Sequence, residues 1–456
     1  MTCAHGRSPR SGRPVGKLVR GPGRAGATRT HVKDITVTDL LEELQWRGLI
    51  AQHTDIDALR AHLASGPVTY YCGFDPTAAS LHHGHLVQLI LMRHLQRAGH
   101  RPLALVGGAT GLIGDPRLVG ERQLNDAETV AGWADNLRHQ IEGLLDFEGP
   151  NPARTVNNLD WTARMSAIDL LRDVGKYFRV GTMLNKDIVA RRLDSDEGIS
   201  YTEFSYQVLQ ANDFLELHRR YGCTLETGGN DQWGNMVGGV DLIRKVDGDE
   251  AHVMTTPIIT KSDGTKFGKS EGGAIWLDPA MMSPYAFYQF WLQTADADVV
   301  KLLKIFTFLD RGRIEELAVE VAERPHRRAA QRELAARVTE MVHGPEQLAR
   351  VQAATEALWG SGDLRTVDAA TLAAATRDLP SGEIAVGRST IVDALVATGL
   401  EKGRSAARRT VASGGASLNN VKVSDEDAPL GAGDLLPGGL ALVRKGRRNL
   451  AVVRAV

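Results

Sequence analysis

Residues 72–85 read CGFDPTAASLHHGH, and the segments on either side of this run decide the fold. Residues 67–72 are typical of a β-strand, and the apolar residues of 85–98 have the spacing of a helix. The strand therefore ends in a glycine-containing turn, and His82 and His85 lie one helical turn apart where the helix begins. In that position they can donate hydrogen bonds to phosphoryl oxygens, next to the free backbone N–H groups of the helix terminus.

Other interpretations of the histidines stay open. They could be partly exposed side chains without a ligand. They could also form a metal cluster together with His83, although a metal site needs a further carboxylate or thiolate at suitable spacing. Gly84 favours a nucleotide, because it leaves room for a flat purine against the backbone.

Strands and helices alternate on both sides of this run. Residues 38–63 have helical spacing, with Thr38 as the expected N-cap. The further predicted strands are 103–106, 154–157 and 223–226, and the further predicted helices are 126–146, 201–221 and 231–246. This order predicts an α/β catalytic domain over residues 34–256, with a doubly wound, Rossmann-like parallel sheet. A ligand of such a sheet lies at the carboxyl ends of the strands.

The rest of the chain divides into segments of different composition. We expect a linker at 257–283, an all-α domain at 284–355, a second linker at 356–383 and a small α/β unit with a basic helix at 384–456. Residues 1–33 are rich in arginine and glycine and contain no acidic residue. They are predicted to be a disordered tail, with a nucleic-acid-binding arm or a transit peptide as alternatives.

Composition limits the class of protein. A hydrophobic content of 43% and a charged content of 24% are ordinary for a globular protein, and the net charge of −1 indicates no particular partner. No apolar run is long enough to span a membrane. The 3 cysteines include no Cys-x-x-Cys pair, so neither a disulfide framework nor a structural zinc site is predicted. A reducing, cytoplasmic setting is expected.

A second run, Lys266-Phe267-Gly268-Lys269-Ser270, supplies cations that the first run lacks. The chain has no G-x-x-x-x-G-K-[ST] sequence, which argues against a P-loop nucleotide site. Two lysines around a glycine can close on a leaving pyrophosphate and stabilise the charge that builds up in the transition state. Such a loop alone is usually a solvated turn, and only its combination with the histidines predicts a triphosphate site.

Together the two runs resemble the signature sequences of class I aminoacyl-tRNA synthetases, HIGH and KMSKS. His83 stands where the first signature has an apolar residue, and this position is expected to face the helix packing rather than ATP. Four further segments resemble tyrosyl-tRNA synthetases, namely residues 71–77, 107–116, 206–213 and 228–233. Tryptophanyl-tRNA synthetase is the alternative within the class, and the pair Tyr71 and Asp213 favours a phenol over an indole.

The resemblance implies roles for individual residues. The expected tyrosine-binding residues are Tyr71 and Asp213 at the phenol, Asp115, Tyr206 and Gln210 at the ammonium group, and Gln232 near the carboxylate. The expected ATP-binding residues are Gly73, Asp75, Thr77, His82, Gly84, His85, Asp231, Lys266 and Lys269, of which His82, His85, Lys266 and Lys269 are expected to be catalytic.

The spacing of one group supports this pocket independently. Tyr206, Gln210 and Asp213 recur at i, i+4 and i+7, so one helix face presents a hydroxyl, an amide and a carboxylate together. A solvated polar stripe would give the same spacing. The apolar neighbours Phe204 and Phe214 instead favour a buried, polar-lined pocket.

The C-terminal unit resembles a small RNA-binding module shared with a ribosomal protein of the small subunit. Its basic helix carries Arg404, Arg408 and Arg409, which are expected to meet tRNA phosphates, although a solvated helix face would look alike. After Asp115-Pro116 the family usually has Ser-Gly-Lys, whereas this chain has Arg117-Leu118-Val119. The local tRNA contact is therefore expected from Arg117 or Arg122.

The residues and the resemblance together predict an enzyme that activates tyrosine with ATP, releases pyrophosphate and transfers the tyrosyl group to the 3′ end of tRNA. Mg²⁺ is expected to accompany ATP, and no tightly bound cofactor or dedicated metal site is expected. The resemblance also implies a homodimer. The alternatives are a catalytically silent, synthetase-like RNA-binding protein and a nucleotidyltransferase that does not use tRNA.

Overall fold

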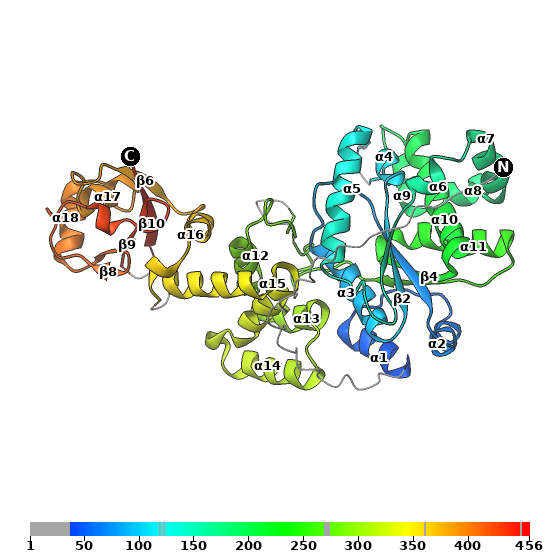
Figure 1. The fold of residues 1–456 in the computed structure, drawn as a ribbon, viewed down its shortest axis with the longest axis horizontal. Coiled ribbons are helices and arrows are strands. Elements are labelled where there is room, and N and C mark those ends of the chain that lie inside the picture. Colours follow the sequence, from blue (N-terminus) through cyan, green and yellow to red (C-terminus); the bar gives the residue numbers. More distant parts are fainter. Residues whose placement is uncertain (1–36, 118–119, 122–123, 269–273, 360–361, 447–448) are drawn as a thin grey trace, which may run out of the picture. The chain divides into compact units, whose positions relative to one another are not determined.

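A five-stranded parallel sheet forms the centre of the catalytic part of the chain (Figure 1). The computed structural model describes residues 37–456 except 118–119, 122–123, 269–273, 360–361 and 447–448, so the predicted tail lies outside the described residues. The strand order is β3-β2-β1-β4-β5. The strands are β1 (Thr69–Phe74), β2 (Arg101–Val106), β3 (Arg154–Asn157), β4 (Cys223–Gly229) and β5 (His252–Thr256). The predicted Rossmann-like sheet is confirmed, and β5 is a strand that the sequence analysis did not predict.

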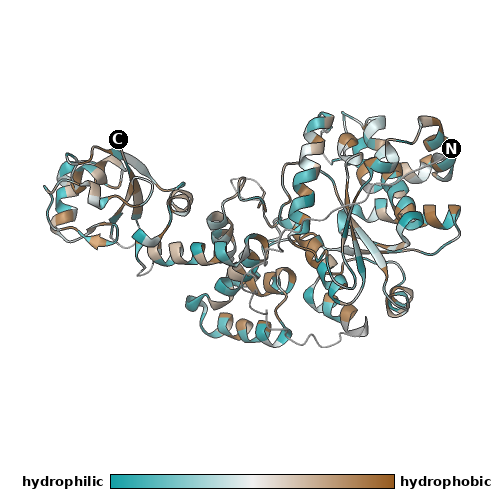
Figure 2. Cartoon of the chain, viewed as in Figure 1, coloured by the Kyte–Doolittle hydropathy of each residue, from teal (hydrophilic) through white to brown (hydrophobic). Residues whose placement is uncertain are grey.

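Helices cover both faces of this sheet. One face packs against α3 (His83–Arg97) and α5 (Ala127–Glu142), and the other against α10 (Tyr201–Tyr221) and α11 (Trp233–Val246). Because side chains alternate along a strand, Tyr70 and Cys72 of β1 join the first apolar cluster while Tyr71 joins the second. This alternation points Tyr71 toward α10. In Figure 2 helices carry hydrophobic and hydrophilic residues on different sides, as expected for helices that cover a core.

The first helical segment differs from the prediction. Residues 38–63 form two helices, α1 (Val37–Arg47) and α2 (Ile56–Ala64), instead of one. Gly48 follows α1 directly and has φ +74°. This left-handed backbone conformation ends the helix, and glycine adopts it more readily than other residues. Thr38 lies inside α1 rather than at its N-cap, and Asp55 caps α2 by accepting hydrogen bonds from the backbone N–H groups of Asp57 and Ala58.

Short helices and turns lie between β2 and α5, between β3 and α10, and after β4. They are α4 (Thr110–Ile113), α6 (Leu159–Thr162), α7 (Ala167–Asp169), α8 (Val180–Leu184) and α9 (Asp187–Leu193), with single helical turns at Leu170–Val174, Gly175–Tyr177 and Asn230–Gln232.

Residues 284–359 are helical, as predicted. The helices are α12 (Pro284–Leu292), α13 (Asp296–Phe306), α14 (Arg311–Glu323) and α15 (Ala329–Trp359), with a helical turn at Pro325–Arg327. The backbone of α15 is kinked at Gly344, which has φ +83° and precedes Pro345. The large side chains Phe287, Trp291 and Phe306 are fully buried among these helices.

The C-terminal part contains a second five-stranded sheet, of order β6-β10-β9-β7-β8. Its strands are β6 (Ser381–Ile384), β7 (Ala416–Leu418), β8 (Val421–Lys422), β9 (Leu440–Lys445) and β10 (Asn449–Ala455), and its helices are α17 (Ile391–Ala397) and α18 (Arg404–Ala412), with a turn at Ala432–Asp434. The segment 356–383, predicted to be a linker, instead contains a turn at Leu364–Thr366, α16 (Ala369–Ala375) and the start of β6. Among the described residues, no helix has the length and apolar character needed to cross a membrane.

Candidate active site

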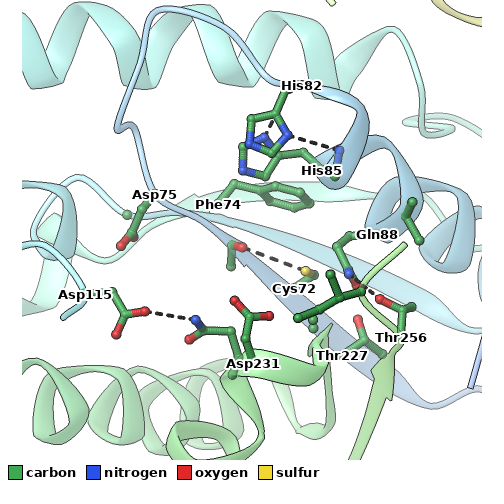
Figure 3. Close-up of a pocket in the computed structure, with 18 of the residues that line it drawn as sticks. Cys72, Phe74, Asp75, His82, His85, Gln88, Asp115, Thr227, Asp231 and Thr256 are labelled. Atoms are coloured by element: carbon green, nitrogen blue, oxygen red, sulfur yellow. Dashed lines mark hydrogen bonds between the residues drawn. The ribbon is translucent and has the colours of Figure 1, made fainter. Parts of the chain in front are cut away.

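A cavity of about 840 Å³ opens at the carboxyl ends of β1 and β4. Its lining includes every residue predicted to bind tyrosine, and every predicted ATP-binding residue except Lys269, which lies outside the described residues. Figure 3 shows His82 and His85 on one side of this cavity and Asp115 and Asp231 on the other. Segments almost two hundred residues apart in sequence therefore meet at the place where a parallel sheet binds its ligand.

The two histidines form the start of α3. The backbone N–H of Gly84 donates to His82 Nδ1 (3.0 Å), and the backbone N–H of His82 donates to His85 Nδ1 (3.2 Å). Their rings stack with centroids 4.0 Å apart. Because Nδ1 accepts in both rings, the proton of each neutral imidazole resides on Nε2. Burial lowers the pKa of both histidines, so they act as neutral donors rather than as cations.

Gly84 lies against the histidine pair. A Cβ at this position would lie 2.9 Å from Cε1 of His82, so a side chain here would press against the His82 ring. Glycine thus suits the packing of the pair, and its expected place beside a purine stays a prediction.

His83 contacts the second signature run. Its ring meets Phe267 edge-on, with centroids 5.7 Å apart. Gly268 has φ +79°, and a Cβ there would lie 2.0 Å from His83 Cε1. The backbone of this run therefore passes directly against His83, which lines the cavity together with Lys266.

Two carboxylates lie on the open side of the cavity, each held by neutral donors. Asp75 accepts hydrogen bonds from Thr110 Oγ1 (2.6 Å) and from Tyr206 Oη (2.7 Å). Asp115 accepts hydrogen bonds from Gln232 Nε2 (2.9 Å) and Asn235 Nδ2 (3.3 Å). Carboxylates held in this way can attract a cationic group of a ligand.

The deep end of the cavity is built around Asp213 of α10. Its Oδ1 accepts from Trp161 Nε1 (2.8 Å) and its Oδ2 from Asn158 Nδ2 (2.9 Å). Burial raises the pKa of Asp213 to about 7, while the two donors act in the opposite direction. The sequence analysis missed Asn158 and Trp161. The position of Asn158 directly after β3, at the carboxyl edge of the sheet, was the available signal.

Glu226 of β4 is a second buried carboxyl group at this end, and it was also missed. Gln210 Nε2 donates to its Oε1 at 3.2 Å, and burial raises its pKa to about 8. An acidic residue inside a largely buried strand, shortly before the Gly228-Gly229 segment, was the signal that could have found it.

The predicted tRNA-binding arginines lie on α18, away from the cavity lining. Arg404 forms an ion pair with Asp393, and Arg408 pairs with Glu426 (2.7 Å) and Asp427 (3.1 Å). Arg409 is exposed. The backbone carbonyl of Arg117 accepts a hydrogen bond from Arg192, whereas Arg122 lies outside the described residues.

Families of tRNA synthetases match both the catalytic part and the C-terminal part of the chain. The family model of class I tRNA synthetases (W and Y) matches residues 63–360, and the model of the SYY-like C-terminal domain of tyrosine–tRNA ligase matches residues 371–453. The tyrosine–tRNA ligase of Streptomyces griseus subsp. griseus is 60% identical over 418 residues, which are 91% of this chain and 99% of that protein. The enzyme of the same name from Streptomyces coelicolor is 59% identical over equal shares of both chains.

Solved structures of tRNA synthetases have the same fold. A C-terminally truncated mitochondrial tyrosyl-tRNA synthetase of Aspergillus nidulans superposes with a TM-score of 0.64 at 31% identity, covering 70% of this chain and 94% of that one. A tryptophanyl-tRNA synthetase of Encephalitozoon cuniculi, at 15% identity and a TM-score of 0.53, shares the fold. Since one family model matches more than half of the chain and the relatives align with nearly all of it, the chain belongs to the class I tRNA synthetases, among the tyrosine–tRNA ligases.

Proposed function

We propose that the protein is a tyrosine–tRNA ligase, which activates L-tyrosine with ATP to tyrosyl-adenylate and transfers the tyrosyl group to the 3′ end of tRNA(Tyr). The observation that carries this proposal is the division of one cavity into two chemically different ends. One end holds the buried Tyr71 and Asp213, and the other holds the neutral donors His82 and His85. The first suits a phenol and the second suits phosphates.

The substrate tyrosine would lie between the carboxylates of Asp213 and Asp115. Asp213 would accept the proton of the phenol and Tyr71 would donate to its oxygen. Asp115, Tyr206 and Gln210 would hold the ammonium group, with Gln232 near the carboxylate. Phenylalanine lacks the hydroxyl and would leave these buried groups without partners, and this kind of site discriminates without editing, as is known for tyrosyl-tRNA synthetases.

Adenylate formation would then need positioning and charge stabilisation rather than a base. The tyrosine carboxylate is already a nucleophile, and it attacks the α-phosphorus of ATP as pyrophosphate leaves. His82 and His85 would donate from Nε2 to phosphoryl oxygens, and Lys266 and Lys269 would neutralise the departing pyrophosphate. Gly73, Asp75, Thr77, Gly84 and Asp231 complete the proposed ATP site. The nucleotide would enter as its magnesium complex.

The other parts of the chain would serve the tRNA. We assign residues 34–256 to catalysis, 284–355 to a helical domain on the anticodon side and 384–456 to RNA binding, with 257–283 and 356–383 between them. Arg404 and Arg408 would exchange their carboxylate partners for tRNA phosphates, and Arg409 would join them. The reaction would take place in the cytoplasm, where the chain would meet tRNA.

We further infer a homodimer. Ile168, Leu171, Val180 and Tyr201 are large apolar side chains with exposed fractions of 57–73% within one stretch of the catalytic part. Apolar surface of this kind is typical of an interface between subunits. Light scattering of the purified protein tests this inference, and a monomer mass would contradict it.

Pyrophosphate exchange with each of the twenty amino acids tests the activity itself. Exchange that depends on tyrosine, followed by charging of tRNA(Tyr), is expected. Exchange that depends on tryptophan, or no exchange with any amino acid, would refute the proposal.

A further inference from the structure

Glu226 lies buried at the tyrosine end of the cavity, where none of the roles proposed above uses it. It faces Tyr71 across the parallel pair of β1 and β4, and the two residues are direct partners in the strand register. Glu226 is 3% exposed and Tyr71 is 1% exposed. A carboxyl group therefore lies beside the hydroxyl that is proposed to recognise the substrate phenol.

The polar groups around Glu226 are incompletely paired. Its Oε1 accepts from Gln210 Nε2, but its Oε2 has no hydrogen-bond partner among the described residues. The same is true of Tyr71 Oη and of Gln210 Oε1. A buried polar atom without a partner is unfavourable, because it has lost its hydrogen bonds to water. These three atoms line a cavity, so their arrangement indicates a ligand or a proton that completes the set.

Two buried carboxyl groups at one end of a pocket do not share the negative charge equally. Asp213 receives two hydrogen bonds, from Trp161 and Asn158, which stabilise its carboxylate form. Glu226 receives one well-formed hydrogen bond, from an amide. The charge therefore favours Asp213 and the proton favours Glu226.

The surroundings of Glu226 favour the same assignment. The titratable groups that act on it or feel its charge are Tyr71 and Cys72 of β1, Asp213 of α10 and Cys223 of its own strand. Its neighbour in β5 is the apolar Val253. None of these groups is a cation that would stabilise an ionised Glu226. Burial raises the pKa of Glu226 to about 8, while hydrogen bonding with Tyr71 and Gln210 acts in the opposite direction and the Asp213 charge adds to the rise.

We propose that Glu226 is a positioning residue for tyrosine recognition, which as a neutral acid donates its proton to the oxygen of Tyr71. Tyr71 has a single proton. When Glu226 donates to its oxygen, that proton is free to point at the phenol oxygen of the substrate, which in turn donates to Asp213. The result is a chain of donors running in one direction, from Glu226 through Tyr71 and the substrate to Asp213. This inference rests on the proposed function.

Ionisation of Glu226 would reverse the first link of this chain. A carboxylate only accepts, so it would compete with the substrate for the proton of Tyr71. The affinity for tyrosine should therefore fall as the pH rises through the pKa of Glu226. An amide at this position donates at every pH, so Glu226→Gln should preserve the direction of the chain and remove its pH dependence.

The test compares the dissociation constants of tyrosine and phenylalanine for the wild type and Glu226→Gln. For a pKa of about 8, the acid fraction of Glu226 falls about tenfold between about pH 7 and about pH 9. The wild type should accordingly lose about tenfold more affinity for tyrosine than the variant over this range. Titration of the substrate ammonium group affects both proteins equally and cancels in the comparison.

Phenylalanine supplies the matched control, because it has no hydroxyl for Tyr71 to reach. Its affinity should change with pH to the same extent in both proteins. The role of Glu226 would be overturned if the affinity for tyrosine changed with pH to the same extent in both proteins. It would also be overturned if phenylalanine showed the same difference between wild type and variant as tyrosine. If wild-type protein at about pH 7 catalyses tyrosine-dependent pyrophosphate exchange, these results overturn this inference alone. If the wild-type protein catalyses no such exchange, the proposed function fails together with this inference.

Discussion

Replacement of Asp213 by alanine tests recognition of the substrate hydroxyl, because tyrosine and phenylalanine differ only in that group. The carboxylate is 2% exposed and accepts hydrogen bonds from Trp161 Nε1 and Asn158 Nδ2. The proposed third donor is the substrate hydroxyl, which tyrosine has and phenylalanine lacks. Asp213→Ala therefore removes an interaction with tyrosine that phenylalanine never makes.

The size of the effect follows from these contacts. A hydrogen bond to a charged acceptor contributes about 1.5–3 kcal/mol, so the ratio of kcat/KM for tyrosine over phenylalanine should fall about 10- to 150-fold. Trp161 and Asn158 lose their acceptor as well, and each buried donor left unpaired costs about 1–3 kcal/mol. That second cost falls on the protein with either substrate. It lowers stability and overall activity but cancels in the ratio.

The assay is amino-acid-dependent pyrophosphate exchange at saturating ATP with each substrate. The control is Asp241→Ala on α11, where the partly exposed carboxylate pairs with the exposed Arg244 at 2.7 Å, outside the cavity lining. The control should leave the substrate ratio as it is, because such surface pairs contribute little. An unchanged ratio in Asp213→Ala, despite lower overall activity, would remove Asp213 from phenol recognition.

Three further predictions follow from other parts of the structure. His85→Ala and Lys269→Ala should each slow adenylate formation about a hundredfold or more with little change in tyrosine affinity, and near-normal pyrophosphate exchange would refute their roles. Arg192→Met should destabilise the catalytic part by about 3–5 kcal/mol, because it removes the 2.9 Å ion pair with the 2%-exposed Glu203 and the hydrogen bonds of Arg192 to three backbone carbonyls. Only the ion-pair part of this loss should be regained in Arg192→Met/Glu203→Met, and a single variant with a wild-type melting temperature would contradict this prediction. Finally, the raised pKa of Glu226, about 8 against an ordinary 4.5, means that folded protein holds a proton that unfolded protein releases, so stability falls as the pH rises through this window. The melting temperature of Glu226→Gln minus that of the wild type should therefore increase between about pH 5 and about pH 8. A difference that does not change with pH would argue against a buried neutral Glu226.

The sequence was most informative where chemistry and local structure coincide. The turn after β1 and the start of α3 place Asp75, His82 and His85 within a few residues, and the period of α10 puts Tyr206, Gln210 and Asp213 on one face. Both groups line the cavity as expected. In each case one short segment carries the whole pattern, so periodicity alone brings the side chains together.

The errors arise where tertiary packing overrides a local pattern. The helical spacing of residues 38–63 continues across Gly48, but the left-handed backbone there ends α1. The strand β5 is fully buried yet contains His252 and two threonines, so its composition hides its position in the sheet.

The protonation state of the tyrosine pocket depends on contacts that no local pattern contains. Asp213 lies in a helix and Glu226 in a strand, and nothing in the sequence around them distinguishes which carboxyl group would keep its charge. The difference comes from Asn158 and Trp161, which lie 55 and 52 residues before Asp213 and reach it only because β3 ends at the edge of the cavity. Two donors stabilise one carboxylate, the other carboxyl group retains a proton, and that proton sets the direction in which Tyr71 can donate. Selection of tyrosine would thus depend on the three-dimensional placement of an amide and an indole that do not touch the substrate.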